Sequence, residues 1–364
     1  MSSFLDNYDS AFNALLDEDV FNLPQSEKER LLMPLLTQLH HHHASQCQEY
    51  GNIFSQYLQS SQFDSLSTFP FLAVRLFKHL DLSSIHAENK FKTLYSSGTT
   101  SQTPAKVVLD KATSARQSKV LVKILQGFIG KARLPMLIID SPEVINSKTQ
   151  YSARGAGIQG LSFFGRDHTY ALNPDMSINW NALNTFCEKY QDKPVLVFGF
   201  TFMVWQHWVL QLSRSKYPLS LSKGVLIHSG GWKKLEAQKV SNAVFKASVK
   251  EVTGISKVHN FYGMAEQVGS IFVECEQGHL HTPVFADIQI RNPYTLDVEG
   301  KNTTGMIQVI STLPTSYPGH SILTEDLGTL LGVDDCACGR KGKYFSVEGR
   351  LPKTEIRGCS DTQQ

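Results

Sequence analysis

Residues 95–106 have the sequence YSSGTTSQTPAK, and this stretch is the most informative one for the fold of the chain. The strand-like segment FKTLY leads into it, and a second strand-like segment, AKVVLD, follows it. Small residues let backbone N–H groups and hydroxyl groups converge on an anion, and glycine permits the backbone conformations that such a turn requires. The spacing of the Walker motif is missing. The turn is therefore a candidate triphosphate site, with a solvated surface turn as the other interpretation.

Apolar periodicity predicts an α/β fold. In residues 1–90 apolar side chains recur at intervals of three and four, which is typical of helices. From residue 91 onward, short apolar runs alternate with helical stretches such as SNAVFKASVKEV, which indicates strands and helices in one α/β fold. The runs are KVVLD, LPMLIID, KPVLVFGF, KGVLIHSGG and SKVHNFYG, followed near the end by GMIQVISTL and SILTEDLGTLL. We expect residues 1–90 to be a helical segment of the same domain, 91–350 the core, and 351–364 a short tail.

The composition excludes several classes of protein. The chain has 364 residues, of which 41% are hydrophobic and 19% charged, and its formal net charge is +2. Lys and Arg residues are scattered, so we expect no nucleic acid partner. No apolar run approaches the roughly 18 residues that a membrane span needs, and the acidic residues near the start argue against a signal peptide. We therefore expect a cytoplasmic protein without a membrane span.

Four consecutive histidines, His40–His43, lie within the helical pattern of the first segment. Expression tags are terminal, so this run belongs to the fold. We expect it to form an exposed helix face, with a chemical role as the alternative.

Four further motifs follow the Ser/Thr-rich turn in a fixed order. They are HSGGWK at 228–233, FYGMAE at 261–266, LTEDLG at 323–328 and EGRLPKTEIRG at 348–358. This series resembles the adenylate-forming superfamily of acyl-CoA synthetases, whose signatures run SGTTG-x-PK, GGEP, YG-x-TE, TGD and GR-x-x-x-x-IK-x-RG. The resemblance covers residues 95–358.

Within that superfamily the chain is most similar to the acyl-protein synthetases of the LuxE type. The signs are FLAVRLFKHL ahead of the turn, GGWK in place of GGEP, the block TSYPGHSILTEDLG, and a Cys directly after the last Arg-Gly. The phenylacetate-CoA ligase branch is the next nearest. The resemblance implies a large α/β adenylate-forming domain of β-sheets and packed helices, without the usual C-terminal lid domain.

The resemblance also implies a nucleotide site for Mg²⁺ and ATP. The turn residues would hold the β- and γ-phosphates, Thr99 at the reacting centre among them, and Lys106 would lie beside them. Glu266 looks like the Mg²⁺ ligand, since a carboxylate is a hard donor for a hard cation; a surface carboxylate is the plain alternative. The residues implied in the turn are Ser96, Ser97, Gly98, Thr99 and Thr100.

The ribose and the adenine have their own implied contacts. Asp326 corresponds to the aspartate that accepts both ribose hydroxyls, and Arg350 to the arginine that completes ribose or phosphate contact. The adenine would lie between the aromatic Tyr262 and backbone of the GGW segment, where glycines allow close approach. These remaining contacts are Gly230, Gly231, Trp232 and Gly263.

The acyl pocket is less well defined. VFGFTFMVWQHW, residues 197–208, has aromatic and sulfur-bearing side chains that suit an alkyl chain, and relatives shape their acid site at this place. A buried helix explains the same segment equally well.

Four of the six cysteines have assignable roles. Three thiols and one imidazole can close a tetrahedral structural Zn²⁺ site, and similar pairs hold zinc in the phenylacetate-CoA ligase branch. We favour Cys275, His281, Cys336 and Cys338, with His279 as the competing ligand and reduced cysteines without a metal as the alternative.

Cys359 is different, because it follows Arg357 in a polar tail, where positive groups favour the reactive thiolate. In the acyl-protein synthetases that this chain resembles, a cysteine at this place receives the acyl group as a thioester. A free surface thiol is the other interpretation.

Three positions depart from the superfamily pattern. They are Ser101, where Gly is usual, Ala265 in place of Thr, and Glu325 in place of Gly. Ala265 lacks the threonine hydroxyl. If that hydroxyl contacts the nucleotide in relatives, its loss weakens nucleotide binding here by on the order of 1 kcal/mol.

The sequence thus predicts an enzyme that activates a fatty acid with Mg-ATP to acyl-AMP and passes the acyl group to Cys359. An acceptor protein such as an acyl-CoA reductase would receive it next. Two alternatives stay open: transfer to CoA or to a sugar amine in polysaccharide biosynthesis, and a non-catalytic nucleotide-binding scaffold.

Overall fold

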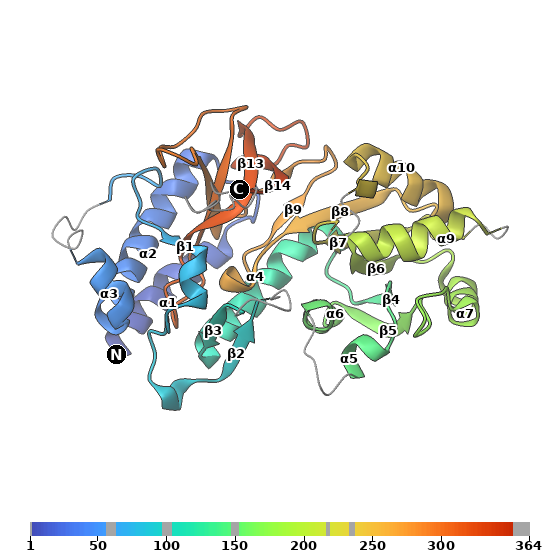
Figure 1. Ribbon diagram of the computed structural model, residues 1–364, viewed down its shortest axis with the longest axis horizontal. Coiled ribbons are helices and arrows are strands. Elements are labelled where there is room, and N and C mark those ends of the chain that lie inside the picture. The colour runs from blue at the N-terminus through green and yellow to red at the C-terminus, as the bar shows by residue number, and fades with distance from the viewer. Residues whose placement is uncertain are drawn as a thin grey trace, which may run out of the picture.

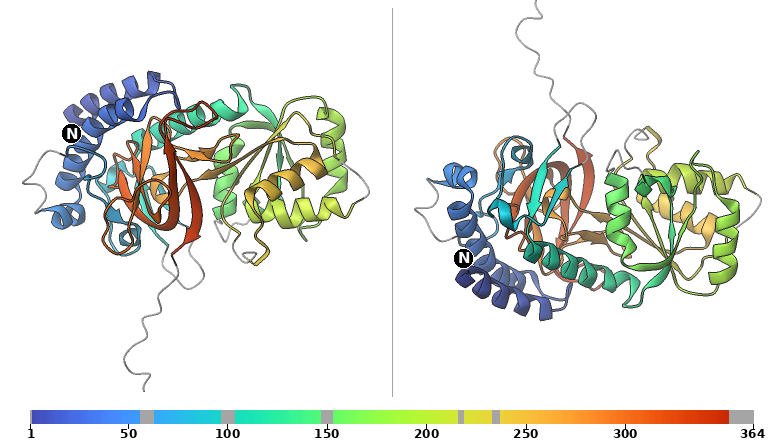
Figure 2. Two further views of the ribbon diagram at one scale, coloured as in Figure 1. Left: turned by 90° about the horizontal axis from the view of Figure 1, so that it is seen from above. Right: turned by 90° about the horizontal axis from the view of Figure 1, so that it is seen from below.

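A computed structural model describes residues 2–55, 63–96, 104–146, 153–215, 219–232 and 237–351. A large mixed sheet runs through the molecule, and a two-stranded ribbon lies beside it. The N-terminal helices cover one end of the large sheet, and the helices of the central part of the chain surround the other end (Figure 1). Figure 2 shows the same arrangement from above and below.

Five parallel strands form one half of the large sheet, in the order β5-β4-β6-β7-β8. The inner strands β4, β6 and β7 have continuous rather than alternating apolar runs, as in Val195–Phe198, because helices cover both faces of the sheet there, whereas the edge strand β5 is polar and largely exposed. The bounds are β4 (Leu134–Ile138), β5 (Gly165–Tyr170), β6 (Val195–Phe200), β7 (Gly224–Ser229) and β8 (Lys257–Tyr262).

Antiparallel strands continue the sheet in the order β9-β10-β14-β13-β12-β11, and β1 pairs with β13 in parallel. β14 is the last described strand of the chain, yet it lies in the interior of the sheet, between β10 and β13. The bounds are β1 (Leu72–Ala73), β9 (Phe272–Glu274), β10 (Leu280–His281), β11 (Ala286–Arg291), β12 (Thr304–Ser311), β13 (Ser321–Val333) and β14 (Lys343–Arg350). β2 (Lys92–Tyr95) and β3 (Lys106–Leu109) form the separate ribbon.

The helices begin at polar capping residues where the sequence offers them. Asp110, Asn179 and Ser241 each accept a hydrogen bond from a backbone N–H of the first turn of the helix that follows, which satisfies a donor that the helix itself leaves unpaired. The long helices are α1 (Ser2–Asp17), α2 (Gln25–Gln46), α3 (Gln48–Phe54), α4 (Lys111–Ile129), α6 (Ala153–Ser162), α7 (Trp180–Tyr190) and α10 (Asn242–Thr253). Short ones are η1 (Val74–Lys78), η2 (Ala87–Asn89), α5 (Glu143–Asn146), α8 (Thr201–Met203), the π-helix η3 (Val204–Val209), α9 (Leu210–Ser213) and η5 (Ala265–Gln267).

The strands expected from the apolar runs are confirmed as β2, β3, β4, β6, β7, β8, β12 and β13, and the helical stretch at 241–252 as α10. The large sheet with packed helices also confirms the α/β class. No helix among the described residues is both long and apolar enough to cross a membrane.

The expectation of an exposed histidine face is wrong for two of the four residues. His40 and His43 have no solvent exposure, whereas His41 is exposed. His40 Nδ1 lies 2.7 Å from the Tyr50 hydroxyl oxygen, and the His43 ring stacks on His320 at 5.1 Å. α2 turns this side toward the antiparallel strands, so tertiary packing buries residues whose polarity suggests a surface.

Candidate active site

Three residues from three strands meet at the carboxyl end of β8. The Tyr262 hydroxyl donates to Asp326 Oδ2 at 2.7 Å, and Arg350 Nε lies 3.3 Å from Asp326 Oδ1. Asp326 and Arg350 face each other directly across β13 and β14, so the sheet register itself fixes the pair. Tyr262 is the last residue of β8, and ligands of open α/β sheets bind beyond the carboxyl ends of such strands. The structure thus brings three predicted site residues together.

The surroundings of Tyr262 determine whether its hydroxyl is protonated. Burial and the neighbouring carboxylate of Asp326 both raise the pKa of Tyr262 well above its ordinary value. The hydroxyl therefore stays protonated and donates to the carboxylate. This bond fixes the orientation of Asp326 and leaves the other carboxylate oxygen beside the exposed guanidinium of Arg350.

Glu266 lies in the same electrostatic environment. It belongs to the short helix η5, which follows β8, and is only 5% exposed. Burial raises the pKa of Glu266, whereas the positive charges of Lys78 and Arg350 oppose this rise and Asp326 adds to it. A buried carboxylate with a second carboxylate nearby gains from a cation, so the donor chemistry fits Mg²⁺.

The two ends of the predicted phosphate turn are held together where β2 ends and β3 begins. The backbone N–H of Ser96 donates to the Ala105 carbonyl at 2.9 Å, and the Ala105 N–H donates to the Ser96 hydroxyl oxygen at 2.9 Å. The Lys106 amine lies 3.3 Å from Asp81 Oδ1, which is an exposed pair. The remaining predicted turn residues, Ser97, Gly98, Thr99 and Thr100, lie outside the described residues, as do Ser101 and Cys359.

The GGW segment follows β7, directly beside β8. Ser229 donates from its hydroxyl to the Phe261 carbonyl at 3.0 Å, which ties the carboxyl ends of the two strands together. Gly230 has φ +84°, a conformation that favours glycine. The Trp232 ring is 8% exposed and packs on Trp205 at 5.6 Å between centroids. The Trp232 ring is thus part of the apolar core.

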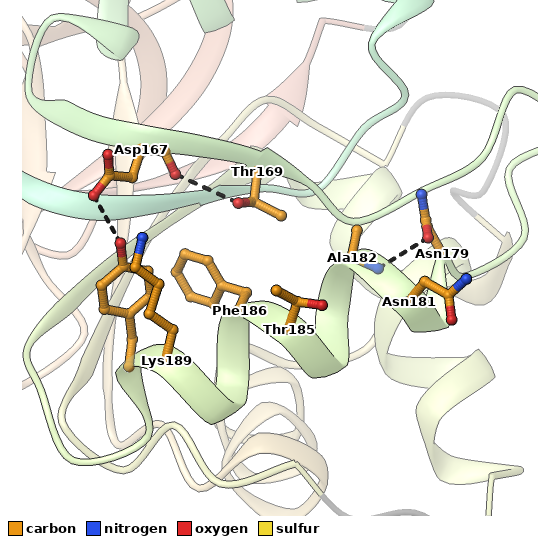
Figure 3. A pocket seen from close by; sticks show the side chains of 9 residues that line it. Asp167, Thr169, Asn179, Asn181, Ala182, Thr185, Phe186 and Lys189 are labelled. Carbon is orange, nitrogen blue, oxygen red and sulfur yellow. Dashed lines mark hydrogen bonds between the residues drawn. The ribbon is translucent and has the colours of Figure 1, made fainter.

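Two cavities among the described residues lie away from this group. One, of about 590 Å³, lies at the edge of the parallel half, between β5 and α7, and Figure 3 shows Asp167 and Phe186 in its lining. The Tyr190 hydroxyl donates to Asp167 Oδ2 there, at 2.7 Å. The other, of about 510 Å³, lies at the start of α4. The segment 197–208 forms the end of β6 and the helical turns after it, where Trp205 and Trp208 are buried in the core.

The predicted metal ligands come together at the ends of β9, β10 and β14. One donor atom from each of Cys275, His281, Cys336 and Cys338 lies within 4.8 Å of the other three. Tetrahedral Zn²⁺ with Zn–S of about 2.3 Å and Zn–N of about 2.0–2.1 Å sets S···S near 3.8 Å and S···N near 3.6 Å. The observed separations are 4.0 Å for Cys275 Sγ to Cys336 Sγ and 3.4 Å for Cys338 Sγ to His281 Nε2. The residues present therefore fit zinc.

The competing ligand, His279, also lies close to the cluster. Its Nδ1 is 3.4 Å from Cys336 Sγ. The set of four mutually close donors nevertheless contains His281. Both imidazole rings stack on Tyr344, at 5.0 and 5.5 Å, which restrains their orientations. The geometry favours His281.

Two residues near the site escaped the sequence reasoning. Arg75 of η1 forms an ion pair with Glu325, the residue that departs from the family glycine, and Lys78 of the same helix contributes positive charge at Glu266. Both belong to FLAVRLFKHL. This segment supported the family resemblance, but the sequence analysis assigned no physical role to its residues. The pairing of β1 with β13 brings this segment to the site.

The comparison with known families agrees with this geometry. Residues 6–364 match the family model described as "Acyl-protein synthetase, LuxE". The chain belongs to this family. The resemblance drawn from the motifs is thereby confirmed, and the chain is a member of a ligase family. A search among curated proteins finds no match to the sequence.

Solved structures of adenylate-forming ligases share the fold. A 2-hydroxyisobutyryl-CoA ligase in complex with 2-HIB-AMP and CoA, in the thioesterification state, is 16% identical, with a TM-score of 0.71 over 93% of this chain and 72% of that one. An open conformation of that ligase, again with 2-HIB-AMP and CoA, is 18% identical, with a TM-score of 0.70 over 93% of this chain and 78% of that one. At these identities the likeness establishes the fold alone.

Proposed function

We propose that this protein uses ATP to activate a fatty acid as acyl-AMP and transfers the acyl group to the thiol of Cys359. Membership of the acyl-protein synthetase family and the fold of adenylate-forming ligases support both steps. The observation that carries the proposal is the meeting of Tyr262, Asp326 and Arg350, with Glu266 close by, at the carboxyl end of β8.

In the first step, a carboxylate oxygen of the acid attacks the α-phosphorus of ATP. A bond forms between that oxygen and phosphorus, the bond to the bridging oxygen breaks, and pyrophosphate leaves. Asp326, oriented by Tyr262, accepts hydrogen bonds from the ribose hydroxyls, and Arg350 faces the phosphate side. Such positioning contributes a large part of the catalysis of phosphoryl and nucleotidyl transfer. Glu266 would hold Mg²⁺, which neutralises charge on the phosphates when bound.

In the second step, the Cys359 thiolate attacks the acyl carbonyl carbon. The thioester bond forms, the carbon–oxygen bond to AMP breaks, AMP leaves, and the thiol proton goes to solvent. The acyl group would then pass to an acceptor protein, such as an acyl-CoA reductase.

We also propose that Cys275, His281, Cys336 and Cys338 hold a structural Zn²⁺. The cluster joins the β9–β10 turn to the segment that leads into β14, the strand that carries Arg350. A closed four-ligand site leaves no open position for substrate, so its contribution is to stability. The division of the chain at residues 90 and 350 stays a prediction.

Mass spectrometry tests the transfer. After incubation with ATP and fatty acid, we expect wild type and Cys187→Ser to gain one hydroxylamine-labile acyl group, and Cys359→Ser to gain none. Cys187, half-buried on α7, is the matched control. An acyl group on Cys359→Ser would refute the thiol assignment. Release of acyl-CoA without labelled protein would favour transfer to CoA, and absence of acid-dependent pyrophosphate exchange would leave the scaffold alternative.

A further inference from the structure

Phe200 lies at the same edge of the sheet as the candidate site, two strands away from β8. It is the last residue of β6, in register with Ser229 of β7, which in turn is in register with Phe261 of β8. Adjacent strands lie about 4.8 Å apart, so the Phe200 backbone is about 10 Å from the end of the strand that carries Tyr262. The strand order reverses at β4, with β5 on one side and β6 on the other, and ligands bind at such switch points.

Two glycines enclose the Phe200 ring. A Cβ atom added at Gly157 of α6 would meet Phe200 Cζ at 2.8 Å, a separation that real Cβ atoms essentially never show. A Cβ added at Gly230 would meet Phe200 Cδ1 at 3.3 Å, and φ there already favours glycine. The ring is therefore held between α6 and the turn that follows β7, and both neighbours lack a side chain where they touch it.

An ion pair between a half-buried arginine and a buried aspartate holds α6 over this position. Arg154 lies three residues before Gly157, on the same face of the helix. Its Nε is 3.5 Å from Oδ2 of Asp140, which is 1% exposed and follows β4, and its Nη1 is 3.1 Å from Met203 Sδ. Figure 1 shows α6 beside β4 and β5. The helix that presses on Phe200 is thus anchored to both neighbouring segments.

We infer that the Phe200 ring sets the length of the acyl group that the site admits. The inference rests on the proposed function. An alkyl chain that extends from the nucleotide site along the carboxyl ends of the strands toward β4 meets this ring between α6 and the Gly230 turn. Phe200 is only partly buried and packs on the apolar cluster that contains Met203 and Trp205, so the surroundings of its ring are apolar.

The test is the chain-length profile of acid-dependent pyrophosphate exchange, measured with straight-chain acids from hexanoic to octadecanoic acid. We expect Phe200→Leu and Phe200→Ala to shift kcat/KM toward longer acids, with a change of about tenfold in the ratio of the longest to the shortest acid. Gly157→Ala, whose new Cβ pushes the ring into the path, should shift the profile toward shorter acids. The matched control is Phe186→Leu, a buried phenylalanine on α7, and its profile should equal that of wild type.

The outcomes separate the two proposals. If wild type shows no acid-dependent exchange, the proposed function fails and this inference falls with it. If wild type is active and Phe200→Leu and Gly157→Ala both keep its rank order of acids, the inference alone is overturned. A uniform loss of rate across all acids in both variants would assign Phe200 a packing role and equally overturn it.

Discussion

Removal of the Tyr262 hydroxyl tests the ribose assignment. In Tyr262→Phe the ring keeps its contacts with Phe272 and Phe345, at 6.2 and 6.3 Å, so the fold should persist. Asp326 loses the only hydroxyl donor that orients its Oδ2 in the described part of the chain. A hydrogen bond to a charged group is worth about 1.5–3 kcal/mol, which corresponds to a fall of about 10-fold to 100-fold in kcat/KM for ATP.

Replacement of Arg350, which lies beside the same carboxylate, should have a smaller effect on kcat/KM for ATP. Its side chain is 81% exposed and its Nε lies 3.3 Å from Asp326 Oδ1, so the pair between them is worth about 1 kcal/mol or less. As far as Arg350 acts through Asp326, Arg350→Gln should lower kcat/KM for ATP by about fivefold at most. A direct contact from Arg350 to phosphate would make the loss larger.

The assay is acid-dependent exchange of labelled pyrophosphate into ATP, with KM measured separately for ATP and for the acid. Thermal unfolding of each variant controls for the fold. We expect Tyr262→Phe and Asp326→Asn to raise KM for ATP and to leave KM for the acid nearly unchanged. Equal KM for ATP in wild type, Tyr262→Phe and Asp326→Asn would refute the assignment of Asp326 to the ribose.

Three further predictions concern the metals and the histidines. Glu266→Gln should reduce Mg²⁺-dependent exchange by about 100-fold, because the amide is neutral, whereas Glu348→Gln on the exposed part of β14 should not. Purified protein should contain one zinc per chain by elemental analysis, and Cys336→Ser should lose it and unfold at a lower temperature. The free energy of unfolding should fall from pH 6.5 toward pH 4, because burial lowers the pKa of His40 to about 4 and the unfolded chain binds the proton more tightly. His40→Phe should flatten this slope, by up to about 1.4 kcal/mol per pH unit, and His41→Phe should leave it unchanged.

Each of these predictions has an outcome that contradicts it. Unchanged exchange in Glu266→Gln would remove this carboxylate from the metal site. Full zinc content in Cys336→Ser would require another ligand set, such as one with His279. Urea unfolding curves with the same pH slope for wild type and His40→Phe would show that the proton taken up on unfolding goes to other groups.

The order of the motifs predicted which side chains meet in space better than local patterns predicted the burial of their neighbours. Tyr262, Asp326 and Arg350 were identified because each lies in a motif of fixed order, and the register of β13 and β14 then places two of them opposite each other. The Trp232 ring, by contrast, is buried, because its direction depends on Trp205 and Phe245, which no local pattern reveals.

Long-range contacts explain the other differences. The burial of His40 and His43 depends on partners distant in sequence, such as His320. The constraint on Phe200 likewise comes from a glycine on another helix, and a strand pattern carries no trace of it. The sequence predicts the cluster of cysteines because its members lie in short motifs, but the preference for His281 over His279 as the fourth candidate ligand depends on the coordinates.

The position of β14 has a consequence for how the molecule assembles. The parallel half and the outer antiparallel strands are joined through β14, which is synthesised after every other described strand. Until it inserts, β10 and β13 each present an unsatisfied edge, and contacts between segments far apart in sequence form slowly. Arg350 belongs to this same strand, so the proposed nucleotide site is completed in the step that closes the sheet.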